Sequence, residues 1–548
     1  MVDYKIVTSL SDLKLDSNLP CFCDTETDGL YGDILLFQLN QGGKAYIYRP
    51  KGIDGILEIL QCVLYKYHCV FYNASYDLAC IVHQAGGQHL FHTKIKHIDD
   101  LLYLAKLTFP GMDKYGLDSV SEFCGIPMYN DIDKKAMQKS FKSGDISDEQ
   151  YQYAAIDVLV MQQIWDKCKV MLDNTAYRLN ILSMLYAIEY QENGLPVDII
   201  AVNSKLVETN MAISDNEDKL SFNVNSPKQC KEVLGTDKSD TETLKHLIAE
   251  GNETAQLIYD QRRLLKRKVM LESYNHPRVF TRFNVAGAVS SRFSATGKDI
   301  HCGINAQQIP RDLKYLFRNT SGKKVMIEAD YSTLELRLAA ALFGDAYMYK
   351  QLLNGEDLHT SMAQKMTGRT DITKDERTKA KAINFGFVFG MSARTFVDYA
   401  FLNYGSHFTY EEALDIRNTY FNMYQDIAKH HKYIWENYKK PGFYVSTALG
   451  WRVKPKLGTD GINIPVQGSG AECTKLALHY FIKEHPTVIE YIVNVVHDSI
   501  LLEVPRKEAN SWKEGLNYYM LKAWQELSKS QAFKYKDIPM LVDINVKE

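Results

Sequence analysis

The sequence predicts a chain of several mixed α/β and α+β domains, and three observations support this fold class. The 548 residues are enough for three or four domains at about 150 residues each. Hydrophobic residues make up 45% of the chain and charged residues 24%, as in globular proteins with buried cores. Runs rich in β-branched and aromatic residues lie in the first and last thirds, and helical periodicity dominates between them. Disordered and fibrous classes are thereby excluded.

Charge, hydropathy and cysteine usage restrict the environment of the protein. The net charge of -3 combines an acidic excess in residues 1–175 with a mildly basic remainder, which is weak evidence for a polyanionic partner. No apolar run approaches the ~20 residues that span a bilayer, and the N-terminal segment lacks the apolar core of a secretory signal. The 10 cysteines include no C-x-x-C pair, which disfavours zinc and disulfide frameworks. We expect a reduced intracellular protein of the cytoplasm, with no membrane partner.

The expected elements follow one another in four groups. In residues 1–170, strands are expected at CFCDTE, ILLFQLN, KAYIYRP and CVFYNA, followed by helices through DDLLYLAKLTF and YQYAAIDVLVMQQIWDKCKVML. Residues 175–280 are mostly helical. Strands return beyond 285 at KKVMIEADYS, YIVNVVHD and SILLEV, with a helical block from about 333 to 440 between them. There is no internal repeat and no low-complexity linker, so the domains are expected to abut.

The first group of chemical interest consists of acids in the N-terminal part. Asp24 and Glu26 are two residues apart in a predicted strand, so both carboxylates project from the same face. Such acids repel each other unless a cation neutralises them, and Mg²⁺ or Mn²⁺ prefers oxygen ligands of this kind. A lone D-x-E pair is more often part of a solvated acidic surface.

Two further pairs strengthen the metal hypothesis. Asn73 and Asp77 are four residues apart, as are Tyr153 and Asp157, which places each pair on one face of a predicted helix. Four carboxylates, an amide and a phenol are what two-metal phosphodiester hydrolysis requires, because the acids hold the ions and the phenol orients water.

A second acidic pair lies in the C-terminal part. Asp330 ends the apolar strand of KKVMIEAD, and Asp498 lies at the tip of a hairpin predicted between YIVNVV and SILLEV. Two carboxylates from distant segments can form a second two-metal site. Each aspartate alone is also a common turn or cap residue.

The helix between these aspartates carries a stripe of cations and rings. In DERTKAKAINFGFVFGMS, Arg377, Lys381, Phe385 and Phe389 recur every four residues and form one slanting row. Two cations one turn apart suit a triphosphate, and an aromatic ring one turn further suits a sugar or base. An amphipathic helix that buries its phenylalanines is the alternative.

These segments resemble two known families. The D-x-E, N-x-x-x-D and Y-x-x-x-D segments are similar to the motifs of proofreading 3′–5′ exonucleases. DYSTLELR, the cationic helix and VVHDS resemble motifs A, B and C of family A DNA polymerases, the polymerase I-like group, from about residue 180 to the end. The resemblance implies a ribonuclease H-like exonuclease domain followed by a right-hand polymerase. The implied boundaries are exonuclease 1–175, thumb 176–280, palm 281–338 and 431–548, and fingers 339–430.

The resemblance also implies roles for single residues. Asp330 and Asp498 match the palm's metal ligands, and two Mg²⁺ ions, with Mn²⁺ as a possible substitute, are expected in each site. The exonuclease ligands are expected to be Asp24, Glu26, Asp77 and Asp157, with Tyr153 orienting the water. Arg377 and Lys381 match triphosphate ligands, Glu335 the steric gate against ribose, and Phe385 the ring that packs on the sugar and discriminates against dideoxynucleotides. The further substrate contacts implied are Asn73, Arg292, Tyr331, His359, Phe389, Asn463, Gln467 and His497.

Some features are weaker or depart from the family pattern. Five cations within two helical turns predict a ridge that follows duplex phosphates: Arg262, Arg263, Lys266, Arg267 and Lys268. Phe389 stands where the family usually has tyrosine, and Ser499 stands where a glutamate usually follows the motif C aspartate. We expect no 5′-nuclease domain, because the exonuclease motif begins by residue 24, and no large insertion for a processivity factor in the thumb.

The expected partners are primer–template DNA, deoxynucleoside triphosphates and an unidentified replisome or processivity factor. The compact architecture is typical of phage replication polymerases, which places the protein in the host cytoplasm if it is phage-encoded. Two rival functions are a single-subunit RNA polymerase and a stand-alone 3′-end nuclease with a non-catalytic DNA-binding part. Glu335 and the N-terminal acids count against the first. Intact Asp330, Asp498, Arg377 and Lys381 count against the second.

Overall fold

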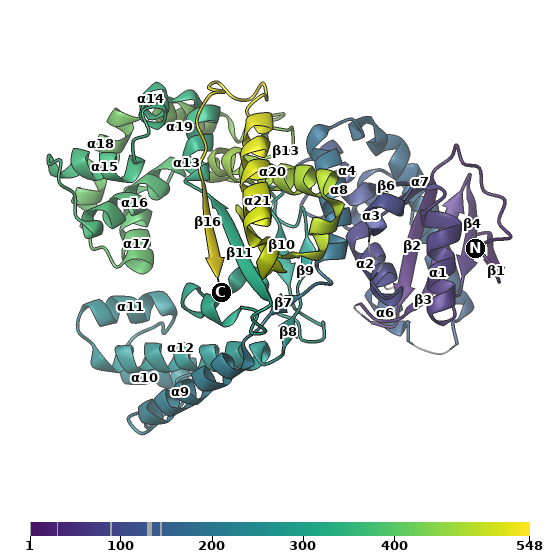
Figure 1. The fold of residues 1–548 in the computed structure, drawn as a ribbon, viewed down its shortest axis with the longest axis horizontal. Coiled ribbons are helices and arrows are strands. Elements are labelled where there is room, and N and C mark those ends of the chain that lie inside the picture. Colours follow the sequence, from purple (N-terminus) through teal and green to yellow (C-terminus); the bar gives the residue numbers. More distant parts are fainter. Residues whose placement is uncertain (1, 30, 88–89, 129–133, 143–144, 548) are drawn as a thin grey trace.

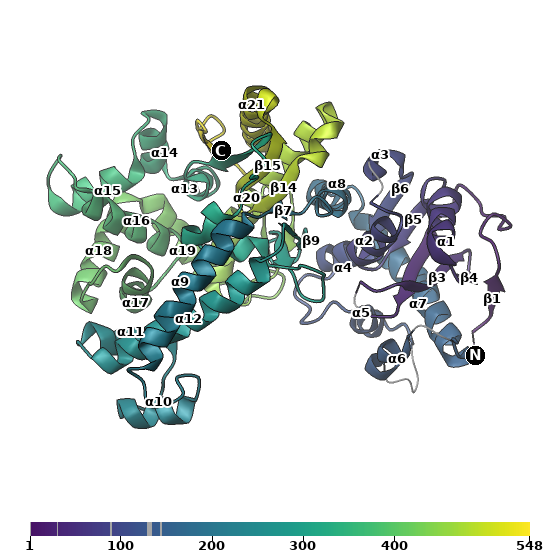
Figure 2. The same cartoon turned by 60° about the horizontal axis from the view of Figure 1, so that its bottom comes forward.

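The computed structural model describes the chain except for residues 1, 30, 88–89, 129–133, 143–144 and 548. An N-terminal domain forms one end of an elongated molecule, and a body of helices around a sheet forms the other (Figure 1). A helical arm extends from this body (Figures 1 and 2). Within the described part of the chain, no helix combines the length and apolar character needed to cross a membrane.

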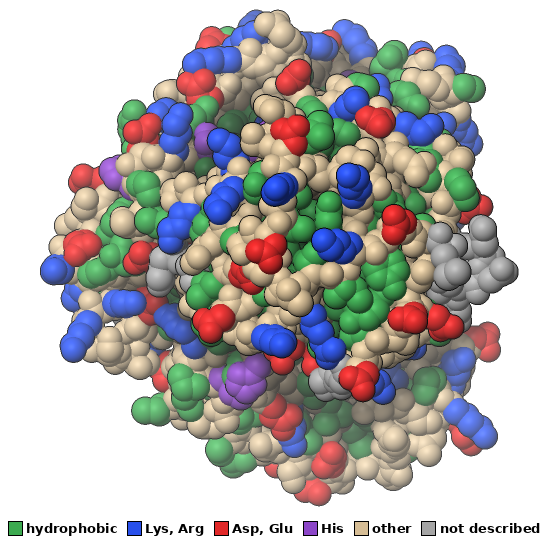
Figure 3. Space-filling view, turned by 90° about the vertical axis from the view of Figure 1, so that its right-hand side faces the viewer, with side chains coloured by type: hydrophobic (Ala, Val, Ile, Leu, Met, Phe, Trp, Pro, Cys, Tyr) green, Lys and Arg blue, Asp and Glu red, His purple; other side chains and the backbone are tan. Residues whose placement is uncertain are grey.

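The N-terminal domain is built on a six-stranded mixed sheet in the order β1-β4-β3-β2-β5-β6. Strands β2, β3 and β4 pair antiparallel, whereas β2, β5 and β6 run parallel. The strands are β1 (Tyr4–Val7), β2 (Cys21–Thr27), β3 (Ile34–Gln41), β4 (Lys44–Tyr48), β5 (His68–Phe71) and β6 (His97–Asp100). The four strands expected here are confirmed. At the outer end of this domain, acidic and basic side chains are interspersed (Figure 3).

The helices of this domain cover the sheet and bury its apolar residues. The long helix α7 packs across β2, β3 and β4. The principal helices are α1 (Gly52–Ile59), α2 (Ala74–Gln84), α3 (Phe91–Lys94), α4 (Leu101–Thr108), α5 (Leu117–Phe123), α6 (Lys134–Ser140) and α7 (Asp148–Cys168). A capping box between Ser147 and Gln150 begins α7, because the side chain of each accepts from the other's backbone N–H.

Helix α8 (Thr175–Tyr190) joins the N-terminal domain to the body. It is buried along most of its length, packing against α2 and α3 on one side and the body's helix α20 (Gly458–Glu484) on the other. The thumb boundary expected at residue 176 falls at the start of this helix, which packs against both domains.

The arm consists of α9 (Ile199–Glu217), α10 (Pro227–Leu234), α11 (Thr241–Ala249) and α12 (Glu253–Tyr274). Each helix begins at a residue whose side chain accepts a hydrogen bond from the first turn, which explains where the helices start: Asp198, Ser226, Asp240 and Asn252. Helix α9 packs along α12, and a small apolar core of its own stabilises the outer half of the arm.

The body is organised around an antiparallel sheet in the order β14-β15-β11-β16. Its strands are β14 (Ile492–Val496), β15 (Ser499–Pro505), β11 (Lys324–Tyr331) and β16 (Val542–Lys547), of which β16 was not predicted. Helices α20 and α21 (Ala509–Leu527) pack together, and α21 also contacts β11. The predicted helical block is α13 (Leu334–Ala339), α14 (Ala346–Leu353), α15 (Leu358–Thr367), α16 (Lys374–Val388), α17 (Ala393–Tyr404), α18 (Tyr410–Met423) and α19 (Gln425–Asn437).

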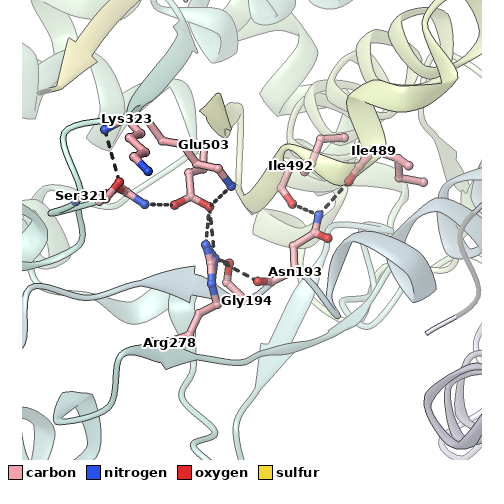
Figure 4. A network of polar contacts seen from close by, with 10 residues as sticks. Asn193, Gly194, Arg278, Ser321, Lys323, Ile489, Ile492 and Glu503 are labelled. Atoms are coloured by element: carbon pink, nitrogen blue, oxygen red, sulfur yellow. Dashed lines mark hydrogen bonds and ion pairs between the residues drawn. The ribbon is translucent and has the colours of Figure 1, made fainter. Parts of the chain in front are cut away.

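A polar network attaches the base of the arm to this sheet (Figure 4). The carboxylate of Glu503 on β15 is 4% exposed and pairs with Arg278 of the short strand β8 (Arg278–Val279). Asn319 donates to the other carboxylate oxygen at 2.7 Å, and Lys324 lies 3.6 Å away. Nearby, the side-chain amide of Asn193 donates to the carbonyls of Ile489 and Ile492 at 2.7 Å each.

Removing the charge of Glu503 is expected to destabilise the body. Glu503→Gln keeps the shape but leaves Arg278 and Lys324 without their anion, at a cost of about 1–3 kcal/mol because both cations are partly exposed to water. Scanning calorimetry measures this as a lower unfolding midpoint. Glu514→Gln, on the exposed face of α21, is the matched control. Equal midpoints for the two variants would contradict the role of the network.

Candidate active sites

Three carboxylates converge in the N-terminal domain. Asp24 and Glu26 project from the same face of β2, and Asp157 comes from α7, which packs across that strand. One carboxylate oxygen from each lies within 4.8 Å of the others. The sequence predicted the first two as neighbours, and the packing of α7 on the sheet supplies the third.

The electrostatics of this cluster favour a bound cation. Burial, followed by the charges of Asp77 and Asp157, raises the pKa of the Asp24 carboxyl well above its usual range. Burial and the charge of Asp157 do the same to the pKa of Glu26. The side-chain amide of Gln38 donates to Asp24 Oδ2 at 2.7 Å and only partly offsets this repulsion. Acids held together in this way suit divalent metal ions with oxygen ligands.

The fourth predicted acid lies beside the cluster. Asp77, in the first turn of α2, accepts hydrogen bonds from the backbone N–H and hydroxyl of Thr25 at 3.0 and 2.6 Å. Burial raises its pKa to about 7 in spite of these bonds. Sequence reasoning missed the buried Asp100, which accepts from the backbone N–H groups of Asn73, Ala74 and Leu102 and so caps two helices. Its position just before a helical run is a recognisable N-cap signal.

Asn73 and Tyr153 take positions that differ from the simple helical expectation. Asn73 precedes α2 in a left-handed conformation (φ 68°), so it does not share a helix face with Asp77. The reason is the cap by Asp100, which starts the helix at Ala74. Tyr153 lies one turn before Asp157 on α7, but its ring is buried next to Phe141. Its water-orienting role stays a prediction.

A second pair of acids lies where the strands β11, β14 and β15 of the body sheet end or turn, which we call the sheet edge. Asp330, near the end of β11, pairs in register with Ser499, which follows the His497-Asp498 turn between β14 and β15. Although Asp330 reaches the surface, the protein around its carboxyl and the charge of Asp498 raise its pKa to about 7. Burial also raises the pKa of Asp498. The predicted hairpin and the meeting of the two aspartates are confirmed.

Of the other residues predicted around this pair, some lie beside the two aspartates and one points away from them. Arg292 forms an ion pair with Glu335 of α13, and both lie close enough to Asp498 to influence its pKa. His497 is exposed at the turn. The prediction that Tyr331 contacts substrate is wrong for its side chain, which is buried and donates from its hydroxyl to the carbonyl of Met520 on α21 at 2.7 Å. Alternation along β11 points Asp330 and Tyr331 to opposite faces.

The cationic helix of the sequence is α16, whose N-terminus carries a capping box between Thr373 and Glu376. Arg377 pairs with Asp357, the cap of α15, at 2.6 Å. One turn on, the Lys381 ammonium lies 5.9 Å from the centre of the Phe385 ring. These three residues form the expected stripe, whereas Phe389 is the C-cap residue beyond the helix.

His359 lies against this stripe but is buried. Its ring centre is 5.7 Å from that of Phe385, and its Nδ1 accepts from the amide of Asn384 at 2.9 Å. Burial, with the charges of Arg377 and Lys381, lowers the pKa of His359 to about 4. The imidazole is therefore neutral, with its proton on Nε2, and any phosphate contact would use that N–H. Asn384 was missed, although it lies within the quoted motif.

Asn463 and Gln467 lie one turn apart on α20 and line a cavity of about 470 Å³. The cavity lies between the N-terminal domain and the body, because Lys106 and Tyr115 of the N-terminal domain also line it. These two predicted contacts to DNA thus share a cavity with Arg452 of the body.

The predicted cationic ridge of α12 is only partly present. Arg262 turns into the arm, where it donates to the carbonyls of Val224 and Ser239. Arg267 pairs with Asp312, and Arg263 lies over the ring of Tyr259. Arg262 is therefore structural, and the continuous ridge is wrong.

Comparison with known proteins places this geometry in a family. The profile described as DNA polymerase family A matches residues 200–548, and that of a 3′–5′ exonuclease matches residues 8–173. DNA polymerase I of Aquifex aeolicus (strain VF5) is 28% identical across all of this chain and 99% of that protein. DNA polymerase I of Caldicellulosiruptor bescii is 26% identical over 86% of this chain, which spans 56% of that longer relative.

A solved structure supports the fold. The POL domain of Pol1 from M. smegmatis, in complex with DNA primer-template and dNTP, superposes with a TM-score of 0.77 over all of this chain at 19% identity. The family profile, covering more than half of the chain, and the full-length similarity to the Aquifex protein agree with the two acidic centres. The chain belongs to DNA polymerase family A, as a DNA-directed DNA polymerase that carries a 3′–5′ exonuclease domain on its N-terminal side.

Proposed function

We propose that this protein adds deoxynucleotides to a primer 3′ end under the direction of a template and removes mismatched ends with its N-terminal domain. The observation that carries the proposal is the pair Asp330 and Asp498, set side by side at the sheet edge, together with a separate cluster of three carboxylates in the other domain. Replication of a phage genome, the finer role expected from the architecture, is included in the proposal.

The residues present fit divalent metal ions at both centres. In each centre, burial and mutual repulsion raise the pKa values of the carboxyl groups. A bound cation would neutralise the carboxylates and so remove this repulsion. Asp330 and Asp498 would hold two Mg²⁺ ions in one centre, with Mn²⁺ as a substitute, and the other centre would use Asp24, Glu26 and Asp157 with Asp77 beside them. The ions would supply charge neutralisation at phosphate and a lower pKa for the attacking hydroxyl or water.

The remaining side chains of the polymerase centre bind and select the nucleotide. Arg377 and Lys381, one turn apart on α16, hold the triphosphate, and Phe385 packs on the sugar. Arg377 exchanges its partner Asp357 for phosphate, which is possible because both are partly exposed. Glu335, paired with Arg292 beside the aspartates, excludes the ribose 2′-hydroxyl.

In the exonuclease centre, Tyr153 orients the attacking water.

In this proposal the arm α9–α12 is the thumb, the sheet with α20 and α21 the palm, and the block α14–α18 the fingers. The arm and the block flank the sheet edge that carries Asp330 and Asp498 (Figures 1 and 2). Such an arrangement lets duplex DNA lie on the palm with the incoming nucleotide against α16.

Primer extension on a defined template tests the proposal against its rivals. With Mg²⁺, we expect extension by deoxynucleotides and little by ribonucleotides. Efficient ribonucleotide use would indicate an RNA polymerase, and digestion without any extension would indicate a stand-alone nuclease.

Two substitutions test the proposed sugar selection. Glu335→Ala is expected to admit ribonucleotides because it removes the block, and Phe385→Tyr to admit dideoxynucleotides because its hydroxyl supplies a lost hydrogen bond. At about 0.5–1.5 kcal/mol for the added hydrogen bond, the dideoxynucleotide selectivity of Phe385→Tyr should change about two- to tenfold. Competition between nucleotide analogues in single-turnover extension measures it. Phe401→Tyr, on neighbouring α17, is the matched control, and unchanged selectivity in both test variants would contradict the assigned positions.

A further inference from the structure

The N-terminal domain contains a second group of convergent donor atoms, separate from its acidic centre. His68 and His97 begin the parallel strands β5 and β6 and lie opposite each other in register. Asp99 lies two residues after His97, on the same face of β6. One donor atom from each of the three residues lies within 4.8 Å of the others.

The two imidazoles are aligned on a single carboxylate oxygen. Their rings stack with centroids 4.1 Å apart and an interplanar angle of 13°. Asp99 Oδ2 lies 2.8 Å from Nε2 of His68 and 3.3 Å from Nε2 of His97. The carboxylate of Asp99 is fully buried, and its other oxygen accepts from the hydroxyl of Tyr177 at 2.6 Å. Asp99 is thus held in place by a supporting hydrogen bond, as is usual for metal ligands.

We propose that His68, His97 and Asp99 bind a transition-metal dication, for which Zn²⁺ is the best match. Two imidazole nitrogens and one carboxylate oxygen form a common three-ligand set for zinc, with water in the fourth position. Mg²⁺ prefers oxygen ligands only, so this mixed set separates the site chemically from the carboxylate centres. The histidines are partly exposed, with 24% and 43% of their side chains accessible, which leaves an entry path. The more exposed His97 ring must turn out of its stack with His68 when the ion binds, because nitrogen lone pairs lie in the ring planes and those of parallel rings do not meet at one ion.

A cationic side chain already lies on these donors. The guanidinium of Arg178 is 3.1 Å from Asp99 Oδ1 and 3.3 Å from His97 Nε2. Its side chain is 38% exposed, so it can turn into solvent when an ion enters. Arg178 and the metal therefore compete for the same carboxylate. Because Tyr177 and Arg178 belong to α8, the bound ion would also influence how the sheet holds the helix that leads to the polymerase body.

Calorimetric titration with Zn²⁺ in excess Mg²⁺ tests the site in the full chain. We expect one Zn²⁺ per chain, with affinity at least about tenfold weaker in His68→Ala and in His97→Ala. Arg178→Gln should bind more tightly, because it removes the competing cation. His83→Ala, a partly exposed histidine of the same domain that pairs with Glu192, is the matched control and should bind as the unmodified protein does.

Two further measurements decide between this site and the others. The double variant Asp24→Ala with Glu26→Ala should retain the Zn²⁺, whereas loss there would assign the ion to the acidic centre and overturn the proposal. Bound Co²⁺ should give visible absorption bands and quench Trp165, whose ring is 5.7 Å from that of His68. Absence of stoichiometric Zn²⁺ binding, or binding unchanged in both histidine variants with circular dichroism showing a folded protein, would also overturn it.

Discussion

Asp330→Ala and Asp498→Ala are each expected to abolish primer extension while the exonuclease stays active. Each substitution removes one of the two carboxylates at the sheet edge that would hold the catalytic ions. Metal ions of this kind supply several kcal/mol of transition-state stabilisation, so extension should slow by at least about 1000-fold. Single-turnover extension of a matched primer measures the rate.

Two controls make this result specific. Digestion of a single-stranded oligonucleotide should stay within about twofold, because the acids for that reaction lie in the other domain. Glu514→Ala, an exposed acid of α21, should extend primers normally. Near-normal extension by either aspartate variant would remove Asp330 and Asp498 from the catalytic centre.

Asp157→Asn is expected to have two effects of opposite sign in the N-terminal domain. The amide is nearly isosteric but cannot serve as an anionic ligand, so hydrolysis of single-stranded 3′ ends should fall by about 1000-fold. In the absence of metal, the same change removes one of three crowded charges, and the unfolding midpoint of the domain should rise. The raised pKa values of Asp24 and Glu26 give the sign, because the folded state disfavours their ionised forms.

The matched control is Asp166→Asn, the same substitution at an exposed position of the same helix, where Asp166 pairs with Lys169. It should change neither digestion nor the midpoint. In copied DNA, the error rate of Asp157→Asn should rise while extension continues, since mismatched ends fray easily and are the preferred substrate. Asp24→Ala with Glu26→Ala should lose digestion in the same way. Undiminished digestion of a mismatched primer by these variants would place the nuclease centre elsewhere.

Much of the fold could be predicted because local patterns carry it. The runs around Asp24, Asp330 and Asp498 are long apolar strands with clear boundaries, and α16 begins at a capping box that its sequence spells out. Strand β6 could not be predicted, because HIDD is short and mostly polar, and its pairing with β5 stabilises it instead. Strand β16, which pairs with β11, was missed although VDINVK alternates apolar and polar residues as a half-buried strand does.

The sequence by itself determined which side chains within one element share a face, such as Asp24 with Glu26 and Arg377 with Lys381, because strand and helix periods are local properties. Only the tertiary structure decided which elements meet. The packing of α7 across β2 brings Asp157 to the acids, and the pairing of β5 with β6 aligns His68 with His97. It also turned Arg262 into the arm, where the guanidinium donates to the buried carbonyls of Val224 and Ser239. Long-range packing and the burial of polar groups are set by the whole chain, so no local pattern records them.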